Sequence, residues 1–248
     1  NVCVGGQLLL LDLIEMLEGH CQLIQSNTDG LIVKLHSIDD YELIDDICYE
    51  WEKRTRMQLE FELYKKIFQK DVNNYIIVDF DGNYKSKGAY VKKLDNLDYD
   101  LPIVNKAIKE YLLNNVHPEV TINNCNELKE FQKIVRVSNK YMYALYNPKV
   151  TEEKVRDKDG KLKTIKVFKG GKIQHEKCFR VFASKLPSDG GIYKVKSHDK
   201  NPEKFADTPD NCFIINGDVN GKPIPKHLNR QWYIDLAIKR LEDFGVEL

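Results

Sequence analysis

The spacing of apolar positions predicts two amphipathic helices in the first part of the chain. Apolar residues recur at helical intervals through residues 7–18, and Gly19 follows as a helix-ending residue. A second apolar stripe runs through residues 39–56, with Asp39 or Asp40 as the candidate N-cap. The acidic residues of this second segment fall on the opposite side from the stripe. We interpret them as a solvated helix face.

Between these helices, two short apolar runs flank a polar tetrapeptide. Residues 21–26 and 31–35 alternate weakly and have the length of strands, and the turn formers between them are Asn27, Thr28, Asp29 and Gly30. The pattern predicts a β-hairpin that carries the Asp29 carboxylate at its tip. A carboxylate on a rigid hairpin can bind a metal ion, and enzymes use metal ions to handle phosphates. Turns also favour Asn and Asp for conformational reasons, so a plain turn explains the tetrapeptide too.

Strand-like alternation follows the second helix. Residues 59–64 alternate apolar and acidic positions, and residues 72–80 and 84–91 predict two strands joined by a tight turn. That turn, in residues 79–83, resembles the start of a calcium-binding loop, as do residues 157–160. Neither segment has the glutamate and intervening ligands that a complete loop requires. We interpret both as hairpin turns.

The rest of the chain mixes helical and strand patterns. Helical spacing is present in residues 101–115 and 126–136, the chain is strand-rich from residue 141, and residues 183–210 are loop-like. Residues 228–244 predict a closing helix. Helices and strands therefore alternate without the regular repeat of a parallel sheet, and the fold class that we expect is α+β.

A basic stretch with interleaved apolar residues lies within the strand-rich part. Residues 161–185 carry eight Lys or Arg residues and a single acidic residue, Glu176. A basic hairpin of this kind is suited to contact a nucleic-acid phosphate backbone. It is equally suited to be a soluble edge hairpin, because lysine protects exposed strands from aggregation. The sequence leaves both interpretations open.

Composition and charge restrict the class of protein. The 248 residues are 42% hydrophobic and 31% charged, which is a globular composition with enough chain for a real core. The longest apolar run, residues 8–11, is far too short to span a bilayer, so we expect no membrane partner. Six cysteines without CxxC pairs indicate free thiols and a cytoplasmic location.

The zero net charge hides an asymmetry. Residues 1–62 have a balance of −9 and the remainder has a balance of +9. Such a division suits a protein that gathers cations in one region and a polyanion in another, although ordinary scatter of surface charge produces it as well.

Four short motifs follow one another within residues 5–93. Asn-Thr-Asp-Gly is followed by Leu-Glu-Phe-Glu at 59–62, by Asp-Val-Asn-Asn-Tyr at 71–75 and by Lys-Ser-Lys-Gly at 85–88. In order and spacing they resemble family B DNA polymerases, in particular the phage-encoded branch. There the corresponding motifs are the Asp-Thr-Asp-Ser turn of motif C, a Leu-Glu-Phe-Glu stem, Lys-Lys-Arg-Tyr and Lys-x-Lys-Gly.

The resemblance implies a role for each residue of the turn. Asp29 matches the second aspartate of motif C, which implies that it ligates a catalytic Mg²⁺ or Mn²⁺ directly. Asn27 replaces the first aspartate, so it can shape the turn but contributes no charge. Thr28 matches the threonine of the motif, and Gly30 replaces a serine and lacks its hydroxyl.

The resemblance also implies contacts with primer-template DNA. Tyr75 matches a tyrosine that lies along the minor groove, and Lys87 would meet a backbone phosphate, with Gly88 allowing close approach. The two asparagines that precede Tyr75 replace basic residues, so their contacts would be polar. The complete implied set is Asn73, Asn74, Tyr75, Lys85, Lys87 and Gly88.

Motif A, which supplies the partner carboxylate, and motif B, which supplies a lysine for the triphosphate, are both missing, as is an exonuclease domain. We therefore expect the C-terminal part of a polymerase, with a partial palm in residues 1–93, a helical thumb segment in residues 94–140 and a strand-rich region in residues 141–248. One carboxylate cannot organise two metals, so this part would be inactive without an upstream segment or subunit. Its other partners would be primer-template DNA and a dNTP.

Two alternatives remain open. The chain could be a non-catalytic DNA-binding or assembly module that retains the palm and thumb shape, or an α+β domain in which the tetrapeptide is only a turn. The first alternative predicts DNA binding that is sensitive to salt and indifferent to Asp29.

Overall fold

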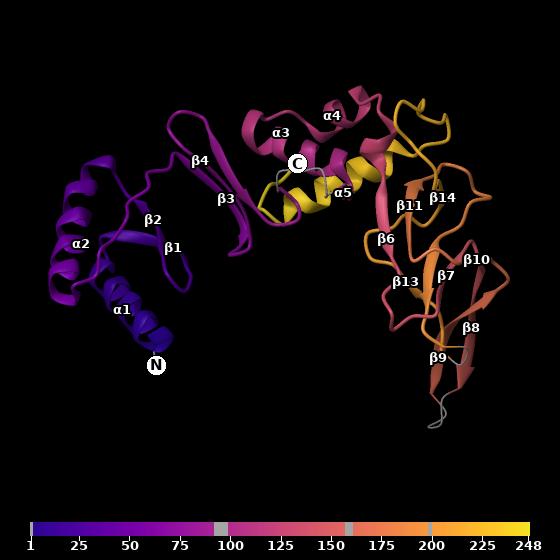
Figure 1. Cartoon of the computed structure of the whole chain (residues 1–248), viewed down its shortest axis with the longest axis horizontal. Coiled ribbons are helices and arrows are strands. Elements are labelled where there is room, and N and C mark those ends of the chain that lie inside the picture. Colours follow the sequence, from indigo (N-terminus) through magenta and orange to yellow (C-terminus); the bar gives the residue numbers. More distant parts are fainter. Residues whose placement is uncertain (1, 92–98, 157–160, 198–199) are drawn as a thin grey trace. The chain divides into compact units, whose positions relative to one another are not determined.

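The computed structural model describes residues 2–91, 99–156, 161–197 and 200–248 (Figure 1). The protein is α+β, as predicted, and all pairings between the strands of its described residues are antiparallel. The chain divides into two compact units, Asn1–Lys87 and Gly88–Leu248.

None of the helices in the described ranges is both long and apolar enough to cross a membrane. The five cysteines whose side chains are described are free thiols, as predicted.

In the first unit, two helices pack on one face of a hairpin. Helices α1 (Val2–Leu17) and α2 (Tyr41–Thr55, preceded by the 3-10 turn Ile38–Asp40) enclose a core with strands β1 (Cys21–Ser26) and β2 (Leu31–Leu35). The buried core residues are Leu13, Leu17, Ile44, Cys48 and Trp51, and the hairpin packs Leu31, Val33 and Leu35 against them. Both predicted helices and the predicted hairpin are confirmed.

A three-stranded sheet completes the first unit. It contains β3 (Lys66–Asp71), β4 (Asn74–Val78) and β5 (Tyr84–Lys87) in that order. The two strands predicted around the 79–83 turn are present as β4 and β5. The turn is a hairpin turn as predicted, in which the Asp79 carboxylate accepts a 2.8 Å hydrogen bond from the Asn83 N–H.

The strand predicted at residues 59–64 is wrong. This segment is irregular, and its apolar side chains Phe61 and Leu63 are 47% and 53% exposed. Alternation is a local pattern, whereas a strand also needs a neighbouring strand to satisfy its backbone. Here the edge position beside β4 is occupied by β3, which the alternation did not predict.

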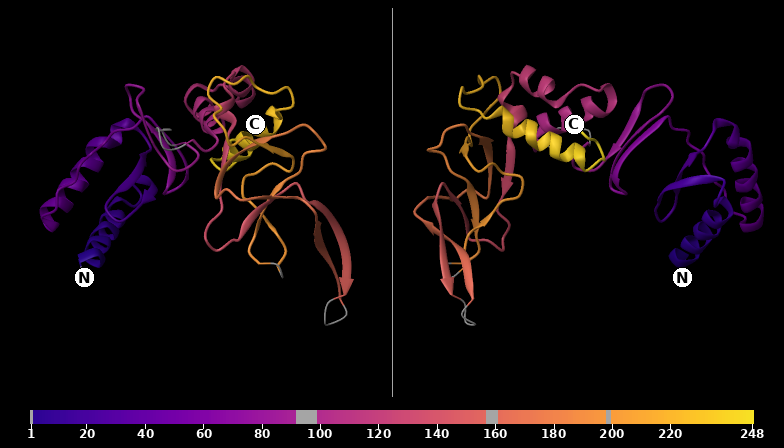
Figure 2. Two further views of the ribbon diagram at one scale, coloured as in Figure 1. Left: turned by 45° about the vertical axis from the view of Figure 1, so that its right-hand side comes forward. Right: turned by 180° about the vertical axis from the view of Figure 1, so that it is seen from behind.

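The second unit contains three packed helices. They are α3 (Pro102–Asn114), α4 (Pro118–Asn124) and α5 (Arg230–Glu242), and Figure 2 shows α5 lying alongside α3. The closing helix and the helix at 101–115 are confirmed. The helix predicted at 126–136 is wrong, because a 3-10 turn (Leu128–Phe131) there leads into strand β6 (Lys133–Arg136). Its partner β11 comes from more than forty residues later, which local spacing cannot reveal.

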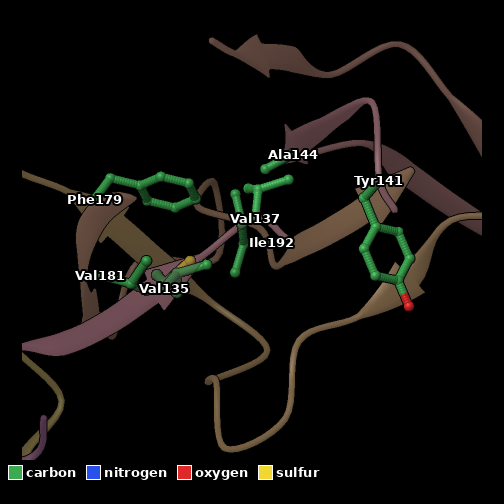
Figure 3. Close-up of a cluster of buried hydrophobic side chains, with 8 residues drawn as sticks. Val135, Val137, Tyr141, Ala144, Phe179, Val181 and Ile192 are labelled. Carbon is green, nitrogen blue, oxygen red and sulfur yellow. The ribbon is translucent and has the colours of Figure 1, made fainter. Parts of the chain in front are cut away.

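Three small sheets make up the rest of this unit. One has the order β14-β11-β6, with β14 at Cys212–Ile214 and β11 at Cys178–Ala183. The second has the order β10-β7-β12-β13, with strands at Lys172–Gln174, Tyr143–Tyr146, Ile192–Val195 and Glu203–Lys204. The third pairs β8 (Lys149–Arg156) with β9 (Leu162–Lys169). A shared cluster of buried side chains lies between the first two sheets and includes Val135, Ala144, Phe179, Val181 and Ile192 (Figure 3).

Two predictions for this region need correction. Residues 161–185 are not one hairpin, because β9, β10 and β11 each pair with a different earlier strand. Residues 183–210 are not entirely loop, because they contain β12 and the short β13. The turn predicted at residues 157–160 lies outside the described residues.

One buried hydroxyl links three elements of the second unit. The Tyr233 hydroxyl donates to the Phe131 carbonyl at 2.7 Å and accepts from the Ala183 N–H at 3.0 Å. The Tyr233 side chain on α5 is fully buried, and burial raises the pKa of Tyr233 well above the ordinary tyrosine value. The hydroxyl therefore stays protonated and holds α5 to the 3-10 turn at Leu128–Phe131 and to β11.

We expect Tyr233→Phe to lower the free energy of unfolding by about 1–3 kcal/mol, because it leaves two buried backbone groups without a partner. Urea unfolding followed by circular dichroism measures this change. Tyr99→Phe is the matched control, since Tyr99 lies in the same unit with its side chain 44% exposed. Equal effects of the two substitutions would contradict the structural role of the Tyr233 hydroxyl.

Candidate functional site

The Asn27–Gly30 turn is held by its own polar groups. The Asn27 N–H donates to the Gly30 carbonyl at 3.0 Å, and the Asn27 side-chain oxygen accepts from the Asp29 N–H at 3.1 Å. Asn27 therefore shapes the turn, as expected for its side chain. Thr28 lies exposed between them. A Cβ on Gly30 would meet its nearest neighbour at 3.8 Å, an ordinary contact, so space does not require glycine here.

The Asp29 carboxylate lies exposed at the tip of this hairpin, with no hydrogen-bond or ion-pair partner among the described residues. The same residues contain no group of three or more His, Cys, Asp or Glu side chains that could hold a metal ion. Asp29 is suited to supply one ligand to a shared site. The described residues do not by themselves fit a two-metal centre, which needs carboxylates from more than one element.

A β-bulge in the hairpin orients the side chain that bonds to the neighbouring sheet. The β1–β2 register shifts between Leu23 and Gln25, and this shift pairs Gln25 with Ile32. Because Leu31 and Val33 face the helices, alternation places Ile32 and Gln25 on the other face. Gln25 is only 6% exposed there, and its side-chain oxygen accepts a 2.8 Å hydrogen bond from the Gln69 amide.

Three of the predicted DNA-contact residues share the sheet face that carries Gln69. Tyr75 on β4 is paired with Gln69 on one side and with Lys87 on the other. Cross-strand partners point to the same face of a sheet, as does Lys85, two residues before Lys87 on β5. The structure therefore brings Tyr75, Lys85 and Lys87 together, on the face that is hydrogen-bonded to the Asp29 hairpin.

The two lysines of this face have different surroundings. Lys85 forms a 2.5 Å ion pair with Glu62, which also accepts a hydrogen bond from the Tyr64 hydroxyl. These groups line part of a pocket of about 250 Å³. Lys87 is exposed and has no ion-pair partner among the described residues, so its charge is uncompensated. Sequence reasoning did not assign Glu62 to the site, although its Leu-Glu-Phe-Glu motif was the available signal.

The remaining predicted residues lie at the ends of the strands. Asn73 lies in the β3–β4 turn and Asn74 begins β4, and the Asn74 amide and the Asn73 N–H donate to the Asp71 carboxylate at 2.8–3.0 Å. These bonds, led by those of Asn74, lower the pKa of Asp71. The Asn74 amide is thus engaged within the turn, whereas the Asn73 side chain is exposed. Gly88 follows β5 with φ of 101°, a conformation that favours glycine.

Comparison with known proteins gives no family for this chain. No protein-family model matches it, and no curated protein matches it significantly. The chemistry of the site therefore has to be judged from its own geometry. That geometry combines an accessible carboxylate with a sheet face that carries an aromatic ring and an uncompensated lysine, a combination suited to a phosphodiester substrate.

We expect Gln69→Ala to loosen the hairpin, because it leaves the buried Gln25 oxygen without a partner at a cost of about 1–3 kcal/mol. Amide hydrogen exchange in β1 and β2 should become roughly 10-fold faster or more, if opening of the hairpin governs exchange. Gln22→Ala, at an exposed position of β1, is the control and should leave exchange unchanged. Unaltered protection in the Gln69 variant would show that the hydrogen bond does not hold the hairpin.

Proposed function

We propose that the chain is the C-terminal palm and thumb part of a template-directed DNA polymerase of the phage-encoded family B type. Its partners are primer-template DNA, a dNTP and an upstream polymerase segment, and it works in the cytoplasm of a bacterial or phage-infected cell. One observation carries the proposal: the Gln69–Gln25 hydrogen bond joins the hairpin that bears Asp29 to the sheet face that bears Tyr75 and Lys87. These are the groups that the motif resemblance assigns to metal binding and to DNA contact.

Asp29 has the role of a metal ligand in this proposal. Nucleotidyl transfer uses two divalent ions that bridge the incoming triphosphate and the primer hydroxyl, and carboxylates from separate palm elements hold them. Asp29 contributes one such carboxylate. The upstream segment, joined covalently or as a subunit, contributes the second carboxylate and the lysine for the triphosphate.

The sheet face holds the DNA. Lys87, which is exposed and uncompensated, contacts a backbone phosphate, and Tyr75 lies next to it along the minor groove. Asn73 adds a polar contact from the β3–β4 turn. Lys85 contributes less charge than Lys87 because Glu62 neutralises it.

Replacement of the Asp29 carboxylate tests the proposal in the enzyme assembled with its upstream segment. We expect Asp29→Asn to reduce Mg²⁺-dependent primer extension by more than about 100-fold, because the amide is a poor ligand for a hard cation. Binding of primer-template DNA, measured by fluorescence anisotropy, should change by less than about twofold, since Asp29 makes no phosphate contact in this arrangement.

Asp81→Asn is the matched control, because Asp81 is an exposed carboxylate in another hairpin turn of the same unit. It should leave primer extension unchanged. Full activity of the Asp29 variant would overturn the polymerase assignment and favour a non-catalytic DNA-binding module. Extension by the isolated chain, if Asp29→Asn abolished it, would contradict the need for an upstream segment.

A further inference from the structure

Strands β8 and β9 form a ribbon that extends beyond the sheets of the second unit (Figures 1 and 2). Eight residue pairs join the two strands, from Lys149 opposite Lys169 to Arg156 opposite Leu162. The ribbon continues the β7–β10 pair of the four-stranded sheet, so that one long hairpin has a bend in its middle. Most residues of the ribbon are exposed on both faces. Since isolated two-stranded hairpins are marginally stable, the base of this one has to be secured.

Left-handed backbone residues make the bend. Asn147, between β7 and β8, has φ of 51°, and Gly170 and Gly171, between β9 and β10, have φ of 68° and 99°. Gly171 is also closely packed, because a Cβ there would lie 3.0 Å from a Leu145 methyl carbon. Both strands therefore turn at the same level of the hairpin.

Side-chain contacts fix the direction of the ribbon after the bend. The Asn147 amide donates to the Ser188 carbonyl at 2.9 Å, and Gly190 packs so closely that a Cβ there would overlap the Asn147 side-chain oxygen. On β9, the Phe168 ring packs edge-to-face on Tyr193 at a centroid distance of 5.1 Å. The ribbon, which we also call the arm, is consequently held at its base by side-chain contacts, whereas its outer part is exposed to solvent.

The arm is strongly basic. Residues 149–169 include eight Lys or Arg residues against four acidic residues, Glu152, Glu153, Asp157 and Asp159, which gives a net charge of +4. The lysines without an ion-pair partner among the described residues are Lys149, Lys154, Lys163, Lys166 and Lys169. Lys149 and Lys169 are direct cross-strand partners, an arrangement in which like charges repel. A bound polyanion would remove this repulsion.

The pattern of side chains selects among polyanions. Lysines occupy both faces, with Lys163 on one and Lys154 and Lys166 on the other, whereas a membrane-binding element needs an apolar face. The one aromatic ring, Phe168, is engaged with Tyr193, so the ribbon has no free ring on which single-stranded bases could stack. A two-stranded ribbon fits the major groove of B-form DNA, whereas the major groove of double-stranded RNA is too narrow.

We propose that the β8–β9 ribbon binds the phosphate backbone of double-stranded DNA without reading its sequence. Lysine contacts phosphate as a point charge, the two ribbon strands have no Asn or Gln side chain for adenine recognition, and their single arginine, Arg156, lies at the end of β8. This gives the strand-rich region a binding role that the motifs in residues 5–93 do not assign. The inference rests on the geometry and charge of the second unit and does not require Asp29 to be catalytic.

The test measures binding of the full chain to a mixed-sequence 20-base-pair DNA duplex by fluorescence anisotropy at several salt concentrations. We expect the variant K154Q/K163Q/K166Q to bind at least about 10-fold more weakly near 0.15 M salt, and the slope of log K against log salt to become shallower by about 2–3. The control variant K222Q/K226Q/K239Q removes three exposed lysines of the same unit and should stay within about twofold of the original chain. Thermal unfolding should be the same for all three proteins.

Three results would overturn the inference. They are absence of duplex binding by the unaltered chain, equal effects of the ribbon and control variants, and tighter binding of a dT20 strand or of anionic phosphatidylserine vesicles through the same lysines. The outcome is separable from that of the polymerase proposal. Asp29→Asn changes primer extension without changing duplex binding, whereas the ribbon variant changes the salt-dependent binding of the chain alone.

Discussion

Small sheets impose the main constraint on this protein. The sheets formed by its described residues have only two to four strands, and sheets of this size need a covering layer or a bond at the edge to be stable. The first unit meets the need with two helices on the β1–β2 hairpin and with one buried amide pair on its other face. The second unit meets it with a core between two sheets and with the Tyr233 hydroxyl, which holds α5 against β11.

The contacts that stabilise these sheets also set the positions of the functional groups. Gln25 reaches Gln69 only because the bulge turns its side chain away from the helices, and this bond decides which sheet face lies next to the Asp29 hairpin. In the second unit, close packing at Gly171 and Gly190 likewise sets the direction of the basic ribbon. Stability and placement are therefore properties of the same few close contacts in both units.

The sequence predicts those features that depend on neighbours along the chain. Helical spacing gave the two helices of the first unit, and turn chemistry placed Asp29 at a hairpin tip, because both signals are local. Strand β6 depends on a partner far along the chain, so the local spacing in residues 126–136 predicts a helix instead. The Gln25–Gln69 pair and the Glu62–Lys85 pair were not predictable for the same reason.

The position of the far end of the ribbon depends strongly on the backbone geometry at its base, near Asn147. Each ribbon strand has eight residues, which corresponds to a length of roughly 26 Å at the usual rise per residue. A rotation of about 10° at the base would therefore displace the far end by roughly 5 Å, more than the rise of one residue along a strand. Substitutions at the exposed lysines should consequently be tolerated far better than a substitution at Gly190. Each lysine substitution removes one contact, whereas a single added methyl group at Gly190 would redirect all the lysines of the ribbon together.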